Sequence, residues 1–164
     1  MSDKLISSIS RPRATPSAVF VFIYDLSKGL SPLFSVPILG KYVPAVYHSS
    51  IVFRDIEIYF GRKGIVVSKP GRTCFGTPVR VVYLGKTPIS HETLRDWLSH
   101  QRTSDFHPTK YHLLQHNCNT FSNFCAIFLT GNSIPHEVLF QTKNLTTAPN
   151  GPLLEFLVGI FENL

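Results

Sequence analysis

The sequence predicts a small α+β domain with strands in the first half of the chain and helices in the second. Runs of Val, Ile, Phe and Tyr recur between residues 19 and 84 and are separated by Gly and Pro. Apolar residues at helical spacing follow between 91 and 130, beside residues suited to helix caps. The chain has 164 residues, of which 43% are apolar and 16% charged, enough for one folded domain with a core.

The expected strands are short. Residues 19–24 form a continuous apolar run, typical of a buried strand. Residues 46–53 alternate, which places His48 on one face of a strand and Ile51 on the other. Three prolines exclude a long helix between 30 and 45. Further strands are expected at 56–60, 65–68 and 79–84, a loop at 70–78, and a short extended piece at 111–114.

Two longer helices are expected in the second half. Ser90 is a suitable N-cap for a helix over 91–102. A second helix should run from Cys118 to Thr130, with Gly131 at the position of a C-terminal cap. Pro135 and Pro152 can each begin another helix. The domain organisation is therefore a flexible N-terminal tail at 1–17, a folded domain at 18–150 and an apolar C-terminal helix at 151–164.

Composition limits the function classes. The net charge is +6, with net +8 over residues 1–102 and net −2 over 103–164. A basic half can attract an acidic partner, or it is simply a solvated surface. No run of Lys and Arg predicts nucleic-acid binding, and no stretch of 18 apolar residues predicts an integral membrane segment.

The cysteines and the chain start suggest a compartment. Three cysteines (74, 118 and 125) do not suggest a disulfide framework, and the first residues lack the apolar run of a signal peptide. We therefore expect a reducing compartment, the cytoplasm and in addition the nucleus.

Cys118 is the first candidate for chemistry, because it stands at the expected start of a helix. A helix N-terminus carries unpaired N–H groups and partial positive charge, which favour a thiolate and can hold an oxyanion. Alternatively, Cys118 is a small buried residue. Cys125 lies seven residues further among phenylalanines and is expected in the core, whereas Cys74 in the loop shows no pattern.

A nucleophilic cysteine needs a base, and the chain has seven histidines. His48 is the candidate inside a strand, beside small serines, although a core histidine is the alternative. His116 lies two residues before Cys118 and should point away from it if the chain is extended there. His112, His116 and Cys118 could also suggest zinc, but no fourth ligand completes a set, so we expect no metal and no cofactor.

Several ordered blocks resemble the PPPDE family of permuted papain-fold peptidases, which includes desumoylating isopeptidases. The resemblance covers about residues 18–140 and leaves out the N-terminal tail and most of the last helix. The blocks are Val21-Phe22-Ile23-Tyr24-Asp25-Leu26-Ser27, Val46-Tyr47-His48-Ser49-Ser50-Ile51-Val52, Tyr59-Phe60-Gly61, Pro70-Gly71-x-Thr73, Phe75-Gly76-x-Pro78, Leu84-Gly85-x-Thr87, His116-Asn117-Cys118-Asn119-Thr120-Phe121-Ser122 and Phe128-Leu129-x-Gly131-x-x-Ile134-Pro135.

The resemblance implies a permuted papain-like fold, a small antiparallel sheet with helices packed around it. It implies that His48 and Cys118 form a catalytic Cys–His dyad, in the reverse chain order to papain. It gives no acidic third member, and Asn119 and Gln115 are candidates to assist. It further implies SUMO-type or ubiquitin-type conjugates as substrates and a homodimer. A protein depalmitoylase or other acyl-transfer enzyme, and an inactive binding module, remain the alternatives.

Overall fold

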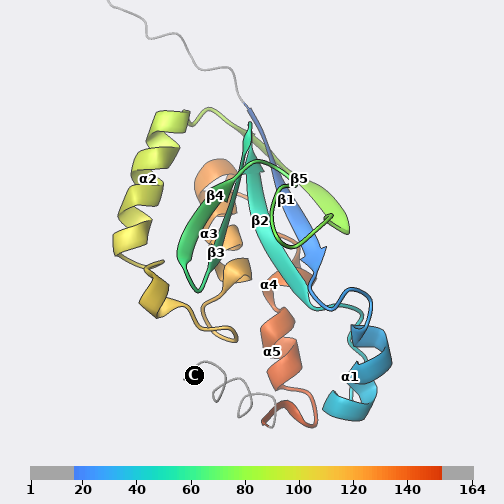
Figure 1. The fold of residues 1–164 in the computed structure, drawn as a ribbon. Helices are drawn as coiled ribbons and strands as arrows, with labels where there is room; N and C mark the ends of the chain where they lie inside the picture. Colours follow the sequence, from blue (N-terminus) through green and yellow to red (C-terminus); the bar gives the residue numbers. More distant parts are fainter. Residues whose placement is uncertain (1–16, 153–164) are drawn as a thin grey trace, which may run out of the picture.

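The computed structural model describes residues 17–152 and contains one five-stranded antiparallel sheet with helices around it (Figure 1). The strand order is β4-β3-β2-β1-β5. The α+β class and the antiparallel sheet predicted from the sequence are confirmed. The strands are β1 (Ser17–Asp25), β2 (Tyr47–Phe53), β3 (Ile56–Gly61), β4 (Gly64–Ser68) and β5 (Arg80–Thr87). The helices are α1 (Ser31–Leu39), α2 (His91–Thr103), the 3-10 helix η1 (Pro108–Lys110), α3 (Cys118–Thr130), α4 (His136–Leu139) and α5 (Gln141–Thr146).

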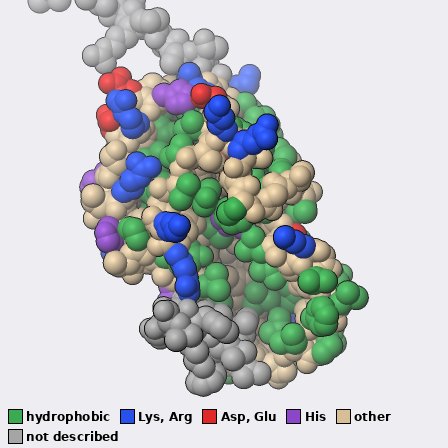
Figure 2. Space-filling view, viewed as in Figure 1, with side chains coloured by type: hydrophobic (Ala, Val, Ile, Leu, Met, Phe, Trp, Pro, Cys, Tyr) green, Lys and Arg blue, Asp and Glu red, His purple; other side chains and the backbone are tan. Residues whose placement is uncertain are grey.

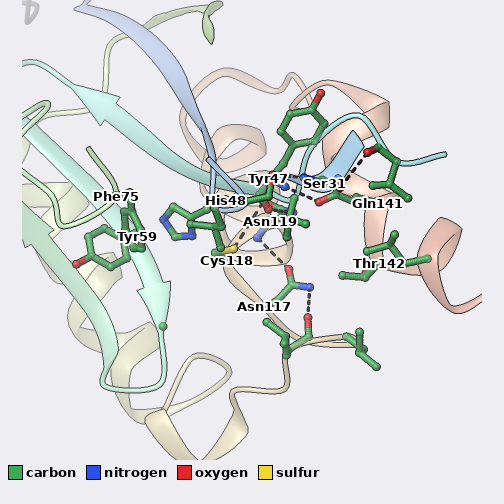
Figure 3. Close-up of a pocket in the computed structure, with 18 of the residues that line it drawn as sticks. Ser31, Tyr47, His48, Tyr59, Phe75, Asn117, Cys118, Asn119, Gln141 and Thr142 are labelled. Atoms are coloured by element: carbon green, nitrogen blue, oxygen red, sulfur yellow. Dashed lines mark hydrogen bonds between the residues drawn. The ribbon is translucent and has the colours of Figure 1, made fainter. Parts of the chain in front are cut away.

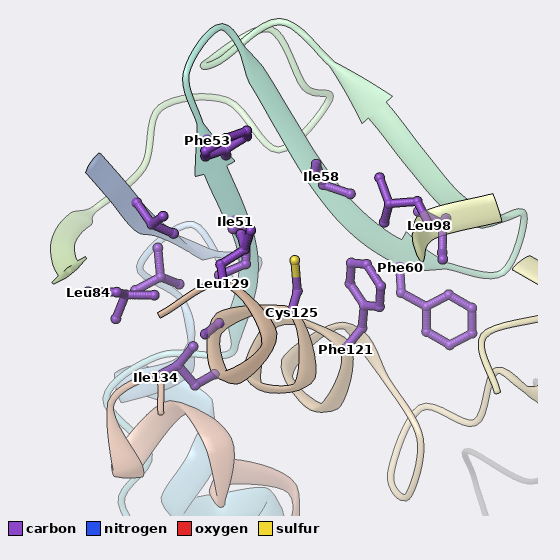
Figure 4. Close-up of a cluster of buried hydrophobic side chains, with 14 of the residues drawn as sticks. Ile51, Phe53, Ile58, Phe60, Leu84, Leu98, Phe121, Cys125, Leu129 and Ile134 are labelled. Atoms are coloured by element: carbon purple, nitrogen blue, oxygen red, sulfur yellow. The ribbon is translucent and has the colours of Figure 1, made fainter. Parts of the chain in front are cut away.

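The two faces of the sheet have different neighbours. Helix α3 packs against one face, where alternate side chains of β2 such as Ile51 and Phe53 are fully buried (Figure 4). Cys125 points from α3 into this core and has no exposed surface, as the sequence predicts. The alternation of β2 places His48 and Ser50 on the opposite face.

Strands β2 and β3 separate along their length. Their ladder holds only three residue pairs, from Ile51–Ile58 to Phe53–Ile56, next to the hairpin turn. Beyond that point β3 continues beside β4 while β2 continues beside β1, so the sheet opens toward the start of β2 (Figure 1). The opening gives side chains from both faces of the sheet access to the same space.

Helix α3 begins and ends where the sequence predicts. Asn117 caps its first turn, because its side-chain oxygen accepts hydrogen bonds from the N–H groups of Asn119 and Thr120. Gly131 ends the helix with a φ of 75°, a conformation that glycine adopts without strain. Local capping therefore fixes where Cys118 lies.

The expected helix over 91–102 is α2, and its N-cap Ser90 accepts a hydrogen bond from the N–H of Thr93. A short helix, α4, follows Pro135 as expected, with Pro135 as its N-cap and His136 as its first residue. Helix α1 was not predicted. It is nine residues long: Pro32 fits in its first turn, Pro37 lies inside it without an N–H to donate, and Gly40 ends it with a φ of 70°.

Other expectations need adjustment. The segment 111–114 is not simply extended: it enters a tight turn closed by backbone hydrogen bonds between His112 and His116. Strand β1 begins at Ser17, which we had placed in the N-terminal tail. The rest of the tail, and the C-terminal helix beyond Pro152, lie outside the described residues.

Candidate functional site

Cys118 is the first residue of α3 and is 7% exposed. The Asn117 cap already occupies the N–H groups of Asn119 and Thr120, and the N–H of Phe121 donates to the Asn117 carbonyl. The expectation that several N–H groups of the helix start would hold an oxyanion is therefore wrong for these three. The N–H of Cys118 itself is the candidate donor that this turn leaves.

His48 lies on β2 and is 4% exposed. Its ring is surrounded by aromatic rings: the Phe75 ring lies 3.8 Å away between centroids, Tyr59 5.4 Å and Tyr24 6.0 Å. Figure 3 shows the His48 ring beside the Cys118 sulfur, with Tyr59 and Phe75 on its other side. Both residues line one cavity, so the structure brings the two predicted site residues together.

Burial controls the charges of this pair. It lowers the pKa of His48 from 6.5 to about 3 and raises the pKa of Cys118 from 9.0 to about 11. Hydrogen bonds from backbone groups of Ser49, Asn119 and Cys118 lower the Cys118 pKa by less. The expected preference for a thiolate is therefore wrong in the free protein. Near neutral pH the pair is an uncharged thiol and an uncharged imidazole, because removing water costs more than the helix end returns.

Asn119 holds the cysteine sulfur from the side. Its amide nitrogen donates to the carbonyls of Tyr47 at 3.3 Å and Val138 at 3.1 Å, which fixes the orientation of the amide. The amide oxygen must then face Ser49 Oγ at 2.7 Å and Cys118 Sγ at 3.7 Å. Because this oxygen can only accept, it receives the S–H of Cys118 and favours the thiol.

The cavity has a volume of about 750 Å³, in the range of small-molecule and peptide sites. It lies where β2 and β3 separate and extends to α1 and α5. Away from the dyad its walls are mainly apolar. The apolar residues of this outer part are Leu26, Leu30, Phe34, Ile38, Leu39, Val43, Leu113, Leu114 and Leu145.

The other candidates lie elsewhere. His116 points away from Cys118 as expected: its ring stacks on Phe106, and Nε2 pairs with the carbonyl of Asp105 at 2.9 Å. Gln115 is exposed and does not line the cavity, whereas Cys74 is exposed and does. Within residues 17–152 no three His, Cys, Asp or Glu side chains are grouped as metal ligands.

Two residues of the site were missed from the sequence. Glu57 is fully buried on β3, and Phe75 of the 70–78 loop covers the His48 ring. A single carboxylate between Ile56 and Ile58 was the available indication, since a charged residue on an apolar strand is buried only with partners. Nothing in the sequence indicated that Phe75 would cover His48.

A cysteine at a helix start that meets a strand histidine where a sheet opens is the arrangement of papain-like cysteine peptidases, here with the histidine first in the chain. The family described as "PPPDE putative peptidase domain" matches residues 17–155, and the chain belongs to this family, so its fold is the permuted papain fold.

Curated relatives agree. The chain is 40% identical to desumoylating isopeptidase 1 of Xenopus laevis over 87% of this chain and 85% of the relative. It is 40% identical to desumoylating isopeptidase 1 of Homo sapiens over 88% and 86%. The DeSI-like protein At4g17486 of Arabidopsis thaliana is 29% identical over 82% and 58%. Among the described residues no helix is long and apolar enough to cross a membrane.

Proposed function

We propose that this protein is a cysteine isopeptidase that removes SUMO-type or ubiquitin-type modifiers, with Cys118 as nucleophile and His48 as base. The observation that carries the proposal is that both residues, 70 positions apart in the chain, line one cavity where the sheet opens. The names of two 40%-identical relatives support the substrate class.

The reaction begins from an uncharged pair. When a substrate carbonyl reaches Cys118, sulfur bonds to the carbonyl carbon and its proton passes to the His48 ring. The negative oxygen that forms lies near the start of α3, where the N–H of Cys118 can donate to it. The C–N bond then breaks, and His48 gives its proton to the leaving lysine amine. A thioester joins the modifier to Cys118.

Water completes the reaction. His48 accepts a proton from water while the water oxygen attacks the thioester carbonyl, and the C–S bond breaks. His48 returns the proton to sulfur, which restores the thiol and releases the modifier with a free carboxyl group. Asn119 then again accepts the S–H of Cys118, as in the free protein.

The test uses SUMO and ubiquitin probes that carry an electrophile at the C-terminus. We expect the wild type to form a covalent adduct and Cys118→Ser to form none, because a serine hydroxyl is far less acidic. Cys74→Ser is the matched control, since Cys74 is exposed and lines the same cavity. An adduct that survives in Cys118→Ser would overturn the assignment of the nucleophile.

The base is tested with two histidine variants. We expect His48→Ala to lower the rate of hydrolysis at least ~10²-fold. His116→Ala should lower it less, because the His116 ring is held away from the cavity by Asp105 and Phe106. The opposite ranking would show that His48 is not the base.

A second candidate is a thioesterase that removes fatty acyl groups from proteins. The apolar outer part of the cavity favours it, because an acyl chain buries apolar surface whereas a modifier tail needs polar contacts. Parallel assays with a SUMO conjugate and an S-acyl thioester decide between the two. Activity on neither, with Cys118 unlabelled, would point to an inactive binding module.

We also propose a homodimer in the cytoplasm, with a nuclear fraction. Exposed apolar side chains gather over α1, at the lower right of Figure 2, and they need a partner surface. Leu30, Leu33, Phe34, Val36 and Ile38 are each more than half exposed. Light scattering during size exclusion measures the mass, and Leu33→Asp should halve it if α1 forms the interface. Imaging of the tagged protein tests the location.

A further inference from the structure

A fully buried carboxyl group lies on β3 close to the site. Glu57 Oε1 accepts hydrogen bonds from the hydroxyls of Tyr24 and Ser50, both at 2.6 Å. Glu57 Oε2 accepts the backbone N–H of Gly71 at 2.7 Å. Glu57, Tyr24 and Ser50 have no exposed surface. Three donors therefore converge on one carboxyl group, and two of them come from strands of the sheet and one from a loop.

The third hydrogen bond attaches the 70–78 loop to the sheet. Gly71 has a φ of 68°, a left-handed conformation suited to glycine. Four residues further along, Phe75 lies against His48 with 3.8 Å between ring centroids and an angle of 33° between the planes. Phe75 also contacts the Tyr24 and Tyr59 rings. The contact between Gly71 and Glu57 is thus close in the chain to the ring that covers the histidine.

We propose that Glu57 is a positioning residue: it anchors the 70–78 loop through Gly71 and thereby holds Phe75 on the ring of His48. This inference rests on the proposed role of His48 as base. Glu57 is then the acidic residue that assists the Cys118–His48 pair, which the sequence did not identify. It acts on His48 through the loop and Phe75 and not by direct contact. None of the hydrogen bonds of Glu57 described above reaches His48, and His48 Nε2 is buried without a hydrogen-bond partner in the described part of the chain.

The anchor has a consequence for protonation. Phe75 contributes to the burial that keeps His48 uncharged, so release of the loop should let water reach the ring and raise its pKa toward 6.5. Loss of a nearby negative charge would instead lower the pKa of His48. The titratable and charged groups that contact His48 or line its cavity are Tyr24, Tyr47, Tyr59, Arg62, Lys63, Cys74, Tyr111 and Cys118. Glu57 lies one contact further away, behind Tyr24.

Two substitutions at Glu57 separate the anchor from the charge. In Glu57→Gln the amide oxygen can accept the Gly71 N–H, and the amide NH₂ can donate to the Tyr24 and Ser50 hydroxyls. This variant keeps the anchor without a carboxylate. Glu57→Met has a similar length but cannot accept any of the three hydrogen bonds. Phe75→Ala removes the cover directly and breaks no hydrogen bond, and Glu92→Gln on the exposed start of α2 is the control.

The readouts are the NMR titration of the His48 ring between pH 5 and 8 and the pH profile of kcat and KM. In the wild type, Glu57→Gln and Glu92→Gln, His48 should not titrate in this range. In Glu57→Met and Phe75→Ala it should titrate, and kcat should fall up to about 10²-fold with KM little changed. Adding Phe75→Ala to Glu57→Met should cause little further change, because both act through one contact.

Several results would overturn the proposal. Glu57→Gln and Glu57→Met with equal effects would show that the charge matters and not the anchor. A loss of stability without a change in the His48 titration would show a merely structural role. If Glu57→Met does not fold, Phe75→Ala decides. A His48 ring that still does not titrate between pH 5 and 8 in Phe75→Ala, with unchanged kcat, would refute the proposal. The titration needs no substrate, so a wild type inactive on every conjugate would refute the proposed function, while the titration would still show whether Glu57 holds the loop and Phe75 on the His48 ring.

Discussion

The burial of His48 makes the stability of the fold depend on pH. In the unfolded chain the ring takes up a proton below its usual pKa of 6.5, whereas in the folded protein burial holds the pKa at about 3. The unfolded state therefore binds more protons between these two values. The contribution of His48 to stability is complete above pH 6.5 and is lost as the pH falls toward 3.

The size of the effect follows from the two pKa values. At about 1.4 kcal/mol for each pH unit, the interval from 6.5 to about 3 corresponds to a total loss of roughly 5 kcal/mol. Between pH 7.5 and pH 5 the expected loss from His48 alone is about 2 kcal/mol. Because His48 is only 4% exposed, solvent screening does not reduce this figure much.

Urea unfolding at pH 7.5 and pH 5 measures the loss. His48→Gln is the comparison, since glutamine does not titrate and the other six histidines are present in both proteins. We expect the wild type to lose about 2 kcal/mol more than His48→Gln between the two pH values. Equal losses, within the error of the linear extrapolation, would refute the argument that His48 is buried uncharged.

Three further predictions follow from the same physical terms. Burial raises the pKa of Cys125 from 9.0 to about 12, so its contribution to stability is lost as the pH rises above 9. Cys125→Ala should lose about 1.4 kcal/mol less than the wild type between pH 8 and pH 10 in urea unfolding, and equal losses would contradict its burial as a thiol. Asn119→Asp places a negative charge beside the Cys118 sulfur and should raise the pKa of Cys118. Alkylation of Cys118 by iodoacetamide at pH 8 should then slow about tenfold for each unit of that rise. An unchanged rate would show that the amide oxygen does not act on the thiol. A chain without residues 151–164 should be less soluble or differ in assembly or location while Cys118 still reacts with the probe, and an unchanged protein would show that 151–164 has no core or assembly role.

The elements predicted well from the sequence are those fixed by neighbouring residues. Helix α3 begins at Cys118 and ends at Thr130, because Asn117 and Gly131 cap its two ends and satisfy the backbone locally. The alternation of β2 predicted which face His48 occupies, since the period of a strand depends only on backbone geometry. The site residues were placed close together through the resemblance, and not through spacing.

The rest depends on contacts between distant segments. The separation of β2 from β3 beyond Ile51 is decided by which neighbour each strand pairs with, and no local pattern shows it. Helix α1 forms despite two prolines, because a nine-residue helix can lose one hydrogen bond. The expectation of a thiolate also depended on contacts between distant segments. The sequence indicated that Cys118 starts a helix, but it did not indicate the burial that raises the pKa of Cys118.

Burial of His48 and Cys118 leaves both side chains uncharged, so other contacts must hold them in position. An ion pair would orient His48 and Cys118 by its own attraction, but here each side chain is held by neutral contacts instead. Phe75 lies against the imidazole with its ring tilted by 33°, and Asn119 accepts the S–H. Charge then arises only as sulfur bonds to a carbonyl, beside two buried side chains, where an oriented N–H dipole stabilises it most. On this argument Cys118 of the free protein reacts only slowly with small electrophiles, and a substrate that fills the cavity and directs its carbonyl at Cys118 supplies the condition for proton transfer.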